Sequence, residues 1–142
     1  MNTASPSTSR AWIELDPEAL KRNVEFLQSR LPKSCRLMPA VKAEAYGHGA
    51  NLIAEQLTQI GIDAFCVACV DEAVSLRLHG IEGEILILGY THPTQFPLLQ
   101  QYHLSQTIVD ASYAALLDQY GKECAYTFPV HLAIDTGMHR LG

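Results

Sequence analysis

The sequence predicts an α/β fold that forms the N-terminal portion, about five βα units, of a TIM-type (β/α)8 barrel. Apolar runs of strand length alternate with longer segments whose apolar residues recur at helical spacing. The strands are apolar throughout, which is typical of a parallel sheet covered by helices. The third observation is that 93 residues separate Lys42 from Asp135 across four units, a compact barrel rhythm. Because five strands cannot close an eightfold barrel, we expect this chain to be a piece of a longer protein.

The N-terminal region is predicted to contain a tail, a strand and a helix. Residues 1–9 are mostly small and polar, so we expect a flexible tail followed by an incomplete barrel domain over 10–142. Residues 11–15 have the composition of a strand. Asp16-Pro17-Glu18 then predicts a helix start, because it offers a capping oxygen, a proline for the first helical position and a carboxylate for the first turn. Pro32 ends this helix.

The second unit carries the lysine around which the chain is organised. Residues 37–41 are predicted to form a short buried strand, and Lys42 follows at its carboxyl end. Gly47 and Gly49 indicate a turn, after which apolar residues at helical spacing predict a helix that ends near Gly61.

The remaining units follow the same alternation of strand and helix. We predict strands at 64–70, 84–88, 105–109 and 128–134, and helices at 71–79, 94–102 and 111–120. Asp110 is expected to cap the last helix, and Gly121 to end it. Because parallel strands point the same way, the last strand delivers residues 135–140 to the sheet edge that also carries Lys42.

Composition narrows the possible partners and location. The chain is 48% hydrophobic and 18% charged, which is ordinary for a globular protein, and its formal net charge is −5. Its basic residues are scattered, so the sequence indicates neither a nucleic-acid-binding surface nor one for acidic membranes. Its start lacks the features of a secretory signal, and no apolar stretch reaches the length of a membrane span. We therefore expect a cytoplasmic protein with no membrane segment in this chain.

The cysteines and histidines do not predict a metal site. The sequence contains four cysteines and six histidines, and Cys66 and Cys69 have the Cys-x-x-Cys spacing of zinc and redox sites. In the predicted strand, however, these two positions face opposite sides, and no second ligand pair exists. We expect both to be thiols that fill the core.

Lys42 is the candidate catalytic residue. The carboxyl edge of a parallel sheet carries the chemistry of α/β folds, and a lysine amine that is buried there becomes a better nucleophile for a Schiff base with an aldehyde. Pyridoxal 5'-phosphate is the obvious aldehyde. Tyr46 can offer a hydroxyl to the cofactor's phosphate. The residues alone also fit a lysine that merely extends from a strand end toward solvent, with Tyr46 in the core.

Two long strings resemble signatures of the alanine racemase family. Residues 40–49, Ala-Val-Lys-Ala-Glu-Ala-Tyr-Gly-His-Gly, are similar to its cofactor-lysine motif, and residues 134–142, Ile-Asp-Thr-Gly-Met-His-Arg-Leu-Gly, are similar to its other long motif. Residues 10–16 and 65–73 resemble weaker family motifs in the expected order. The resemblance thus runs from about residue 10 to the last residue.

The resemblance implies a pyridoxal-phosphate-dependent racemase that interconverts L- and D-alanine and supplies D-alanine for peptidoglycan. In that family Lys42 holds the cofactor and acts as one acid/base group, Tyr46 contacts the phosphate, and Arg140 lies beside the phenolic oxygen and the substrate carboxylate. Met138 corresponds to a residue near the substrate. The family works as a homodimer in which the partner contributes a catalytic tyrosine that lies beyond this chain, so we expect the isolated piece to be inactive.

One position departs from the family pattern and leaves the substrate open. Many family members carry a lysine, modified to a carbamate, at the position of Ala133, where it braces the arginine. A methyl group accepts no hydrogen bond, so a serine/alanine racemase of the same fold is an alternative. A non-catalytic pyridoxal-phosphate carrier and a decarboxylase on a similar barrel are further alternatives, but the two long strings favour the racemase.

Overall fold

The fold is a four-stranded parallel sheet with helices packed beside it. The computed structural model describes residues 12–142, so the expected tail at 1–9 lies outside the described residues. The strands lie in the order β1 (Ala64–Val67), β2 (Glu84–Ile87), β3 (Ser105–Ile108) and β4 (Val130–Leu132), and every pair is parallel. The helices are α1 (Pro17–Gln28), α2 (Lys42–Gly47), α3 (Ala50–Gln59), α4 (Val70–Leu78), the 3₁₀ helix η1 (Pro93–Gln95), α5 (Phe96–Gln101) and α6 (Ala111–Cys124).

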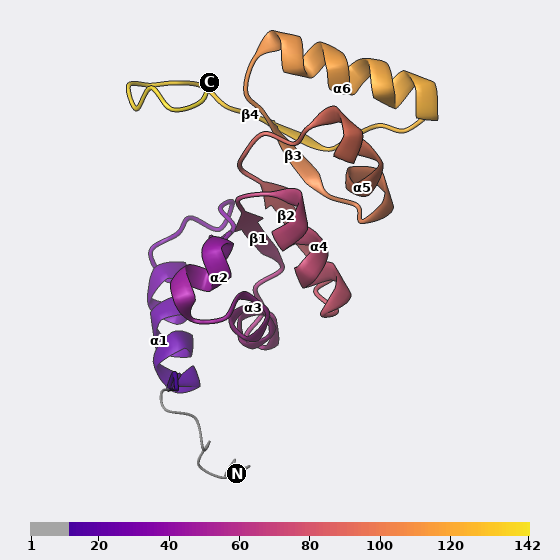
Figure 1. Cartoon of the computed structure of the whole chain (residues 1–142). Coiled ribbons are helices and arrows are strands. Elements are labelled where there is room, and N and C mark those ends of the chain that lie inside the picture. The colour runs from indigo at the N-terminus through magenta and orange to yellow at the C-terminus, as the bar shows by residue number, and fades with distance from the viewer. Residues whose placement is uncertain (1–11) are drawn as a thin grey trace.

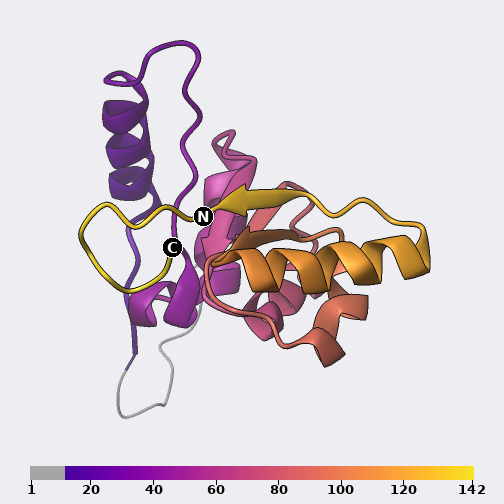
Figure 2. The same cartoon turned by 90° about the horizontal axis from the view of Figure 1, so that it is seen from above.

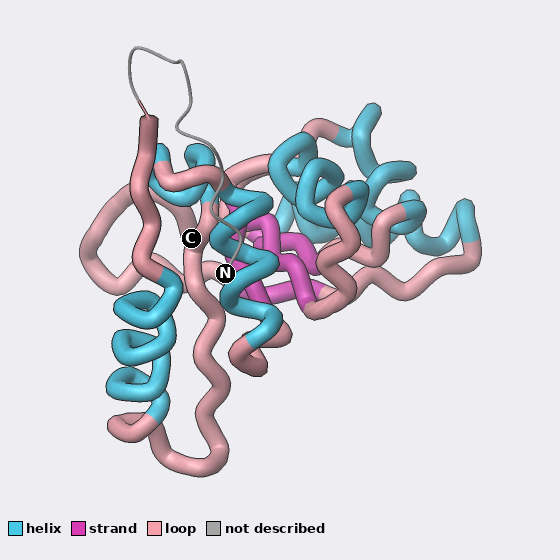
Figure 3. Tube along the Cα trace, turned by 90° about the horizontal axis from the view of Figure 1, so that it is seen from below, coloured by secondary structure: helices cyan, strands magenta, loops and turns pink. Residues whose placement is uncertain are grey.

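The elements are arranged as successive strand–helix units (Figure 1). α4, α5 and α6 each follow a strand, whereas α1 lies to one side and a long segment returns from it to the sheet (Figures 2 and 3). After β4 the chain leaves the sheet as a loop that leads to the C-terminus (Figures 1 and 2). The predicted α/β class and the repeated βα units are confirmed. Within residues 12–142, no helix is both long and apolar enough to span a membrane.

Burial explains why β1 and most of β2 are apolar, whereas β3 carries the polar residues Ser105, Gln106 and Thr107 into the core. Every residue of β1 and β3 is buried, and only Glu84 of β2 is partly exposed. One core runs from α1 to α6 through the sheet, and its largest fully buried side chains include Phe65, Ile85, Phe96 and Tyr113. Because both faces of these strands are removed from water, they do not alternate between buried apolar and exposed polar residues.

Two helix starts form as the capping rules predict. The carboxylate of Asp16 accepts hydrogen bonds from the backbone N–H groups of Glu18 and Ala19 at 3.0 and 3.1 Å. Asp110 accepts one from Tyr113 N at 2.7 Å. In both cases a carboxylate satisfies backbone donors that have no partner within the helix.

Two predicted strands are absent as regular strands. Residues 12–15 form no strand, since Trp12 and Ile13 are exposed and no neighbouring strand pairs with them in the described chain; Ala11 lies outside it. Residues 37–41 form only a single parallel bridge, from Ala40 to Cys66. Pro39 has no N–H to donate, and this shortens the ladder.

Several boundaries also differ from the prediction, among them the ends of β4, which spans only Val130–Leu132. β1 ends at Val67, and Val70 begins α4 with Cys69 as its N-cap. Cys69 is therefore exposed, whereas Cys66 is buried in the core, so the expectation that both fill the core is wrong for Cys69. α6 continues through Gly121 to Cys124. A Cβ at Gly121 would lie 2.8 Å from the carbonyl oxygen of Tyr126, so this glycine permits a close approach and does not end the helix.

Candidate functional site

Lys42 stands at the carboxyl edge of the sheet, as predicted. Cys66 N donates to Pro39 O at 2.8 Å, and Val41 N donates to Cys66 O at 2.9 Å. These two bonds align the segment before the lysine with β1, in parallel. Val41 is buried and Lys42 is half-buried. The chain thus anchors the residue before the lysine in the core and leaves the amine at the edge where strands and helices meet.

A left-handed turn follows the lysine, where the sequence predicted an ordinary glycine-rich turn. The four residues from Ala43 to Tyr46 have φ between 50 and 58° and ψ between 37 and 51°. For residues with a Cβ this conformation costs roughly 1–2 kcal/mol each. Local backbone hydrogen bonds close the turn, from Ala45 N to Val41 O at 2.9 Å and from Gly49 N to Glu44 O at 2.7 Å, and the side chain of Ala45 is buried.

The Glu44 and Glu72 side chains complete this turn. One Glu44 carboxylate oxygen accepts from Ala50 N at 3.1 Å, at the start of α3. Glu72, in the first turn of α4, accepts from Ala43 N at 2.7 Å and from Ala68 N at 2.7 Å. The sequence did not single out Glu72. Its contact with Ala43 spans 29 residues, so no local pattern could have revealed it.

The segment after β4 is ordered by Asp135. Its carboxylate accepts from Gly137 N at 2.9 Å, from His139 N at 3.0 Å and pairs with the His139 ring Nδ1 at 2.8 Å. Hydrogen bonds from the backbone of His139 and Gly137 lower the pKa of Asp135. His139 has φ 55° and Gly137 has φ 127°, so the segment folds back sharply. Asp135 therefore shapes the turn that presents Arg140.

A cleft of about 500 Å³ joins these two segments at the strand ends. Three of the four predicted site residues line it, namely Lys42, Met138 and Arg140. Ala133, where the sequence departs from the family pattern, also lines it, as do Ala68 and Gly89. A Cβ at Gly89 would lie 2.5 Å from Ala68 O, so glycine lets the ends of β1 and β2 approach closely beneath the cleft. An amine and a guanidinium in one cleft suit a ligand that carries an aldehyde and anionic oxygens.

Tyr46 is the predicted site residue that lies apart from the others. It stands on the left-handed turn, its side chain is 63% exposed, and it is not among the residues that line the cleft. Its proximity in sequence to Lys42 therefore does not bring its ring into the cleft of this chain. The contact between Tyr46 and a cofactor phosphate stays a prediction.

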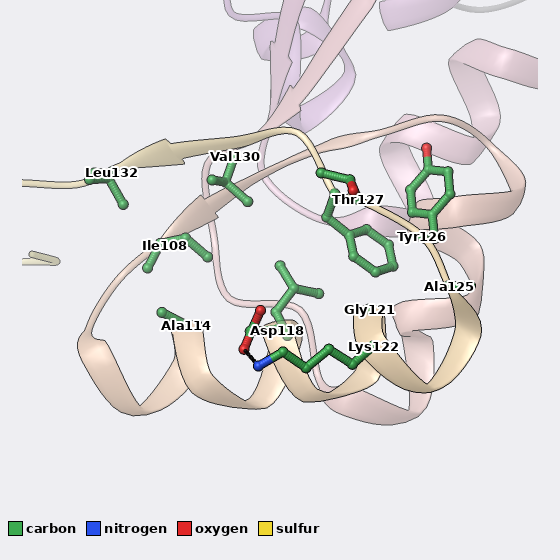
Figure 4. A pocket seen from close by; sticks show the side chains of 12 residues that line it. Ile108, Ala114, Asp118, Gly121, Lys122, Ala125, Tyr126, Thr127, Val130 and Leu132 are labelled. Carbon is green, nitrogen blue, oxygen red and sulfur yellow. Dashed lines mark hydrogen bonds and ion pairs between the residues drawn. The ribbon is translucent and has the colours of Figure 1, made fainter.

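A second concave surface lies between α6 and β4, away from the lysine. It measures about 470 Å³ and is mostly apolar (Figure 4). Its two charged side chains, Asp118 and Lys122, pair with each other at 2.6 Å. β4 beside it is exposed, with Leu132 73% accessible. This surface lies at the open edge of the sheet, where β4 is the last strand. Across residues 12–142 no cluster of three metal-ligating side chains occurs.

Comparison with known proteins agrees with this geometry. Residues 15–142 match the family model described as alanine racemase, N-terminal domain. The chain is 44% identical to an amino-acid racemase of Enterococcus faecalis over 95% of its length and 18% of that protein. It is 42% identical to the alanine racemase of Geobacter sp. over 92% of its length and 35% of that protein. It is also 42% identical to the serine/alanine racemase of Enterococcus gallinarum, over 94% of its length and 18% of that protein.

The same relationship is seen in three dimensions. The crystal structure of alanine racemase from E. faecalis superimposes with a TM-score of 0.82 at 41% identity, over 89% of this chain and 34% of that one. The chain thus spans about a third or less of the relatives that it matches. Sequence, fold and the placement of the lysine agree, and the chain belongs to the alanine racemase family, of which it represents part of the N-terminal barrel domain.

Proposed function

We propose that the whole protein containing this chain is a pyridoxal-phosphate-dependent racemase that interconverts L- and D-alanine. The observation that carries the proposal is the presence of Lys42 and Arg140 in one cleft at the carboxyl edge of the sheet. Ninety-seven residues lie between them in the sequence, so only the barrel topology brings them together. Racemases make up the relatives described above, and the alanine racemases among them support the substrate.

The residues present fit pyridoxal phosphate. The cleft volume of about 500 Å³ falls in the usual range for small-molecule sites, about 300–1,000 Å³. Lys42 supplies an amine for the aldehyde, and Arg140 supplies a planar donor for the phenolic oxygen or a substrate carboxylate. When bound, this cofactor stabilises the negative charge that develops on the substrate α-carbon.

Each residue then has a defined task. Lys42 would hold the cofactor through its amine, and the same amine would move a proton to or from one face of the substrate α-carbon. Arg140 orients the anionic groups, Met138 packs against the substrate, and Tyr46 donates its hydroxyl to the phosphate. The opposite face needs a second acid/base group. We assign that role to a tyrosine of the partner subunit in a homodimer, because the family pattern implies it.

A serine/alanine racemase is the second candidate, because of Ala133. This residue lines the same cleft as Arg140, so its methyl group leaves the guanidinium without the carbamate brace that many alanine racemases have. A differently held arginine tolerates a different side chain on the substrate. One of the relatives carries this dual name, and L-serine therefore belongs in every assay.

Borohydride reduction followed by peptide mapping tests the proposal. Reduction fixes pyridoxal phosphate to the amine that holds it, so the whole protein should carry one pyridoxyl group on Lys42. Lys42→Ala should lose the label and reduce racemisation of L-alanine and L-serine, followed with D-amino-acid oxidase, to background. Lys33→Ala, an exposed lysine outside the cleft, is the matched control. A pyridoxyl group on another lysine would overturn the assignment, and label without D-product would indicate a carrier.

A further inference from the structure

Glu72 connects two peptide groups at the edge of the cleft. Its Oε1 accepts a hydrogen bond from Ala43 N at 2.7 Å, and its Oε2 accepts one from Ala68 N at 2.7 Å. Ala43 directly follows Lys42, and Ala68 lines the cleft just after β1. One carboxylate therefore ties the peptide that leaves the lysine to the end of the neighbouring strand. Both bonds have the short length of charge-assisted hydrogen bonds.

The backbone N–H of Ala43 needs a hydrogen-bond acceptor from outside its own turn. The turn that begins at Lys42 closes with Ala45 N donating to Val41 O at 2.9 Å, and the first N–H groups of any helical turn have no partner within it. Ala43 is also the first of the four left-handed residues. Without the bond to Glu72, this N–H would lose its only protein acceptor among the described residues, and the turn would lose a contact that opposes its backbone strain.

We propose that Glu72 is a positioning residue for Lys42, which fixes the direction of the lysine side chain by clamping the Ala43 and Ala68 peptides. The inference rests on the proposed role of Lys42 and deepens it. A carboxylate is required because both of its oxygens act as acceptors. Glutamine has nearly the same shape but only one acceptor oxygen, and its NH2 group would face an N–H donor.

Asp71 provides a matched control for the charge of Glu72. It precedes Glu72 in the first turn of α4, it is exposed, and its carboxylate contributes to the same helix start. Asp71→Asn and Glu72→Gln each remove one negative charge near the N-terminus of α4, so the helix dipole loses the same interaction in both variants. A difference between the two variants thus reports the clamp.

Hydrogen exchange in the whole, cofactor-free protein tests the clamp directly. Glu72→Gln should accelerate amide exchange at Ala43 or Ala68 about tenfold or more, the effect of losing one charge-assisted hydrogen bond in a local opening. Asp71→Asn should leave both amides within about twofold of the wild-type rate. Glu72→Asp, which keeps the charge on a shorter stem, should give intermediate rates and covers the case that Glu72→Gln does not fold. Unchanged exchange in the Gln or Asp variant would overturn the proposal.

The kinetics of the cofactor-bound enzyme give a second measurement, which would not change in this way if Glu72 only stabilised the fold. Glu72→Gln should still accept a pyridoxyl label on Lys42, with kcat lowered about tenfold or more and KM changed by less than about twofold, because the lysine must be aimed for proton transfer. Wild-type kcat in Glu72→Gln would contradict the positioning role. Absence of label on wild-type Lys42 would refute the proposed function instead, whatever the exchange rates show.

Discussion

Replacement of Arg77 tests how the ends of the barrel units are held together. Arg77 lies near the end of α4, and its guanidinium donates to four backbone carbonyls. Nε donates to Tyr102 O at 2.8 Å, one terminal nitrogen to Ile81 O at 2.6 Å and Gly83 O at 2.7 Å, and the other to His103 O at 3.0 Å. These carbonyls belong to the loops that precede β2 and β3. Burial lowers the pKa of Arg77, consistent with a structural position.

The magnitude follows from the three part-buried bonds. Arg77→Met keeps much of the packing of the stem but leaves these carbonyls without a donor. Because water can hydrogen-bond to these carbonyls in part, we expect the free energy of unfolding to fall by about 1 kcal/mol per lost bond, or about 3 kcal/mol in all. Arg77→Lys keeps the charge but lacks the planar fork, so we expect it to lose about half as much.

Thermal unfolding of the whole protein measures this loss. At about 2–4 °C per kcal/mol for a domain of 150–250 residues, Arg77→Met should lower the unfolding midpoint by about 6–12 °C. Arg22→Met is the control, because Arg22 makes only an exposed ion pair with Asp16 at 3.7 Å in the described chain, and such pairs contribute little. A shift for Arg77→Met no larger than that of Arg22→Met would refute the reasoning.

Two further predictions concern the sheet and the cleft. Burial would raise the pKa of Glu84, but hydrogen bonds from Arg36 and His131 outweigh it and lower the pKa. The stability that comes from this lowered pKa is present above the pKa of Glu84 in the unfolded chain and is lost as the pH falls through its pKa in the folded chain. Glu84→Gln should therefore be less stable than wild type at pH 7, by about 1–2 kcal/mol. Urea unfolding at several pH values should show this difference shrinking below about pH 4.5. A pH-independent difference would contradict this. Ala133→Lys should make the racemisation rate respond to bicarbonate by several-fold, through a carbamate that braces Arg140; an unchanged response would mean that the cleft braces Arg140 in another way.

Local sequence signals predicted those parts of the fold that depend on neighbouring residues. Asp16 and Asp110 cap helices because a short side chain reaches N–H groups two or three residues away. The apolar runs of β1 and β2 are strands because a parallel sheet buries both faces. The same signals failed at residues 12–15, where strand composition has no pairing partner in the described chain.

Contacts between distant segments were beyond local patterns. Gly121 resembles a helix stop, yet it is required by the carbonyl of Tyr126 that passes close to it. Arg77 resembles a basic residue that favours a helix end, yet it joins two loops through four carbonyls. In both cases the residue type is explained by a neighbour that only the folded chain supplies.

The sequence by itself determined the α/β class, the family resemblance that the comparisons confirm, and the edge of the sheet that carries Lys42 and Arg140. Parallel strands share one carboxyl edge, so their order along the chain was sufficient for that placement. Only the tertiary structure decided that a left-handed turn follows Lys42, that Glu72 clamps it, and that Tyr46 lies outside the cleft. The physical reason is that a strained backbone persists only where distant groups hold it, and those contacts exist only after folding.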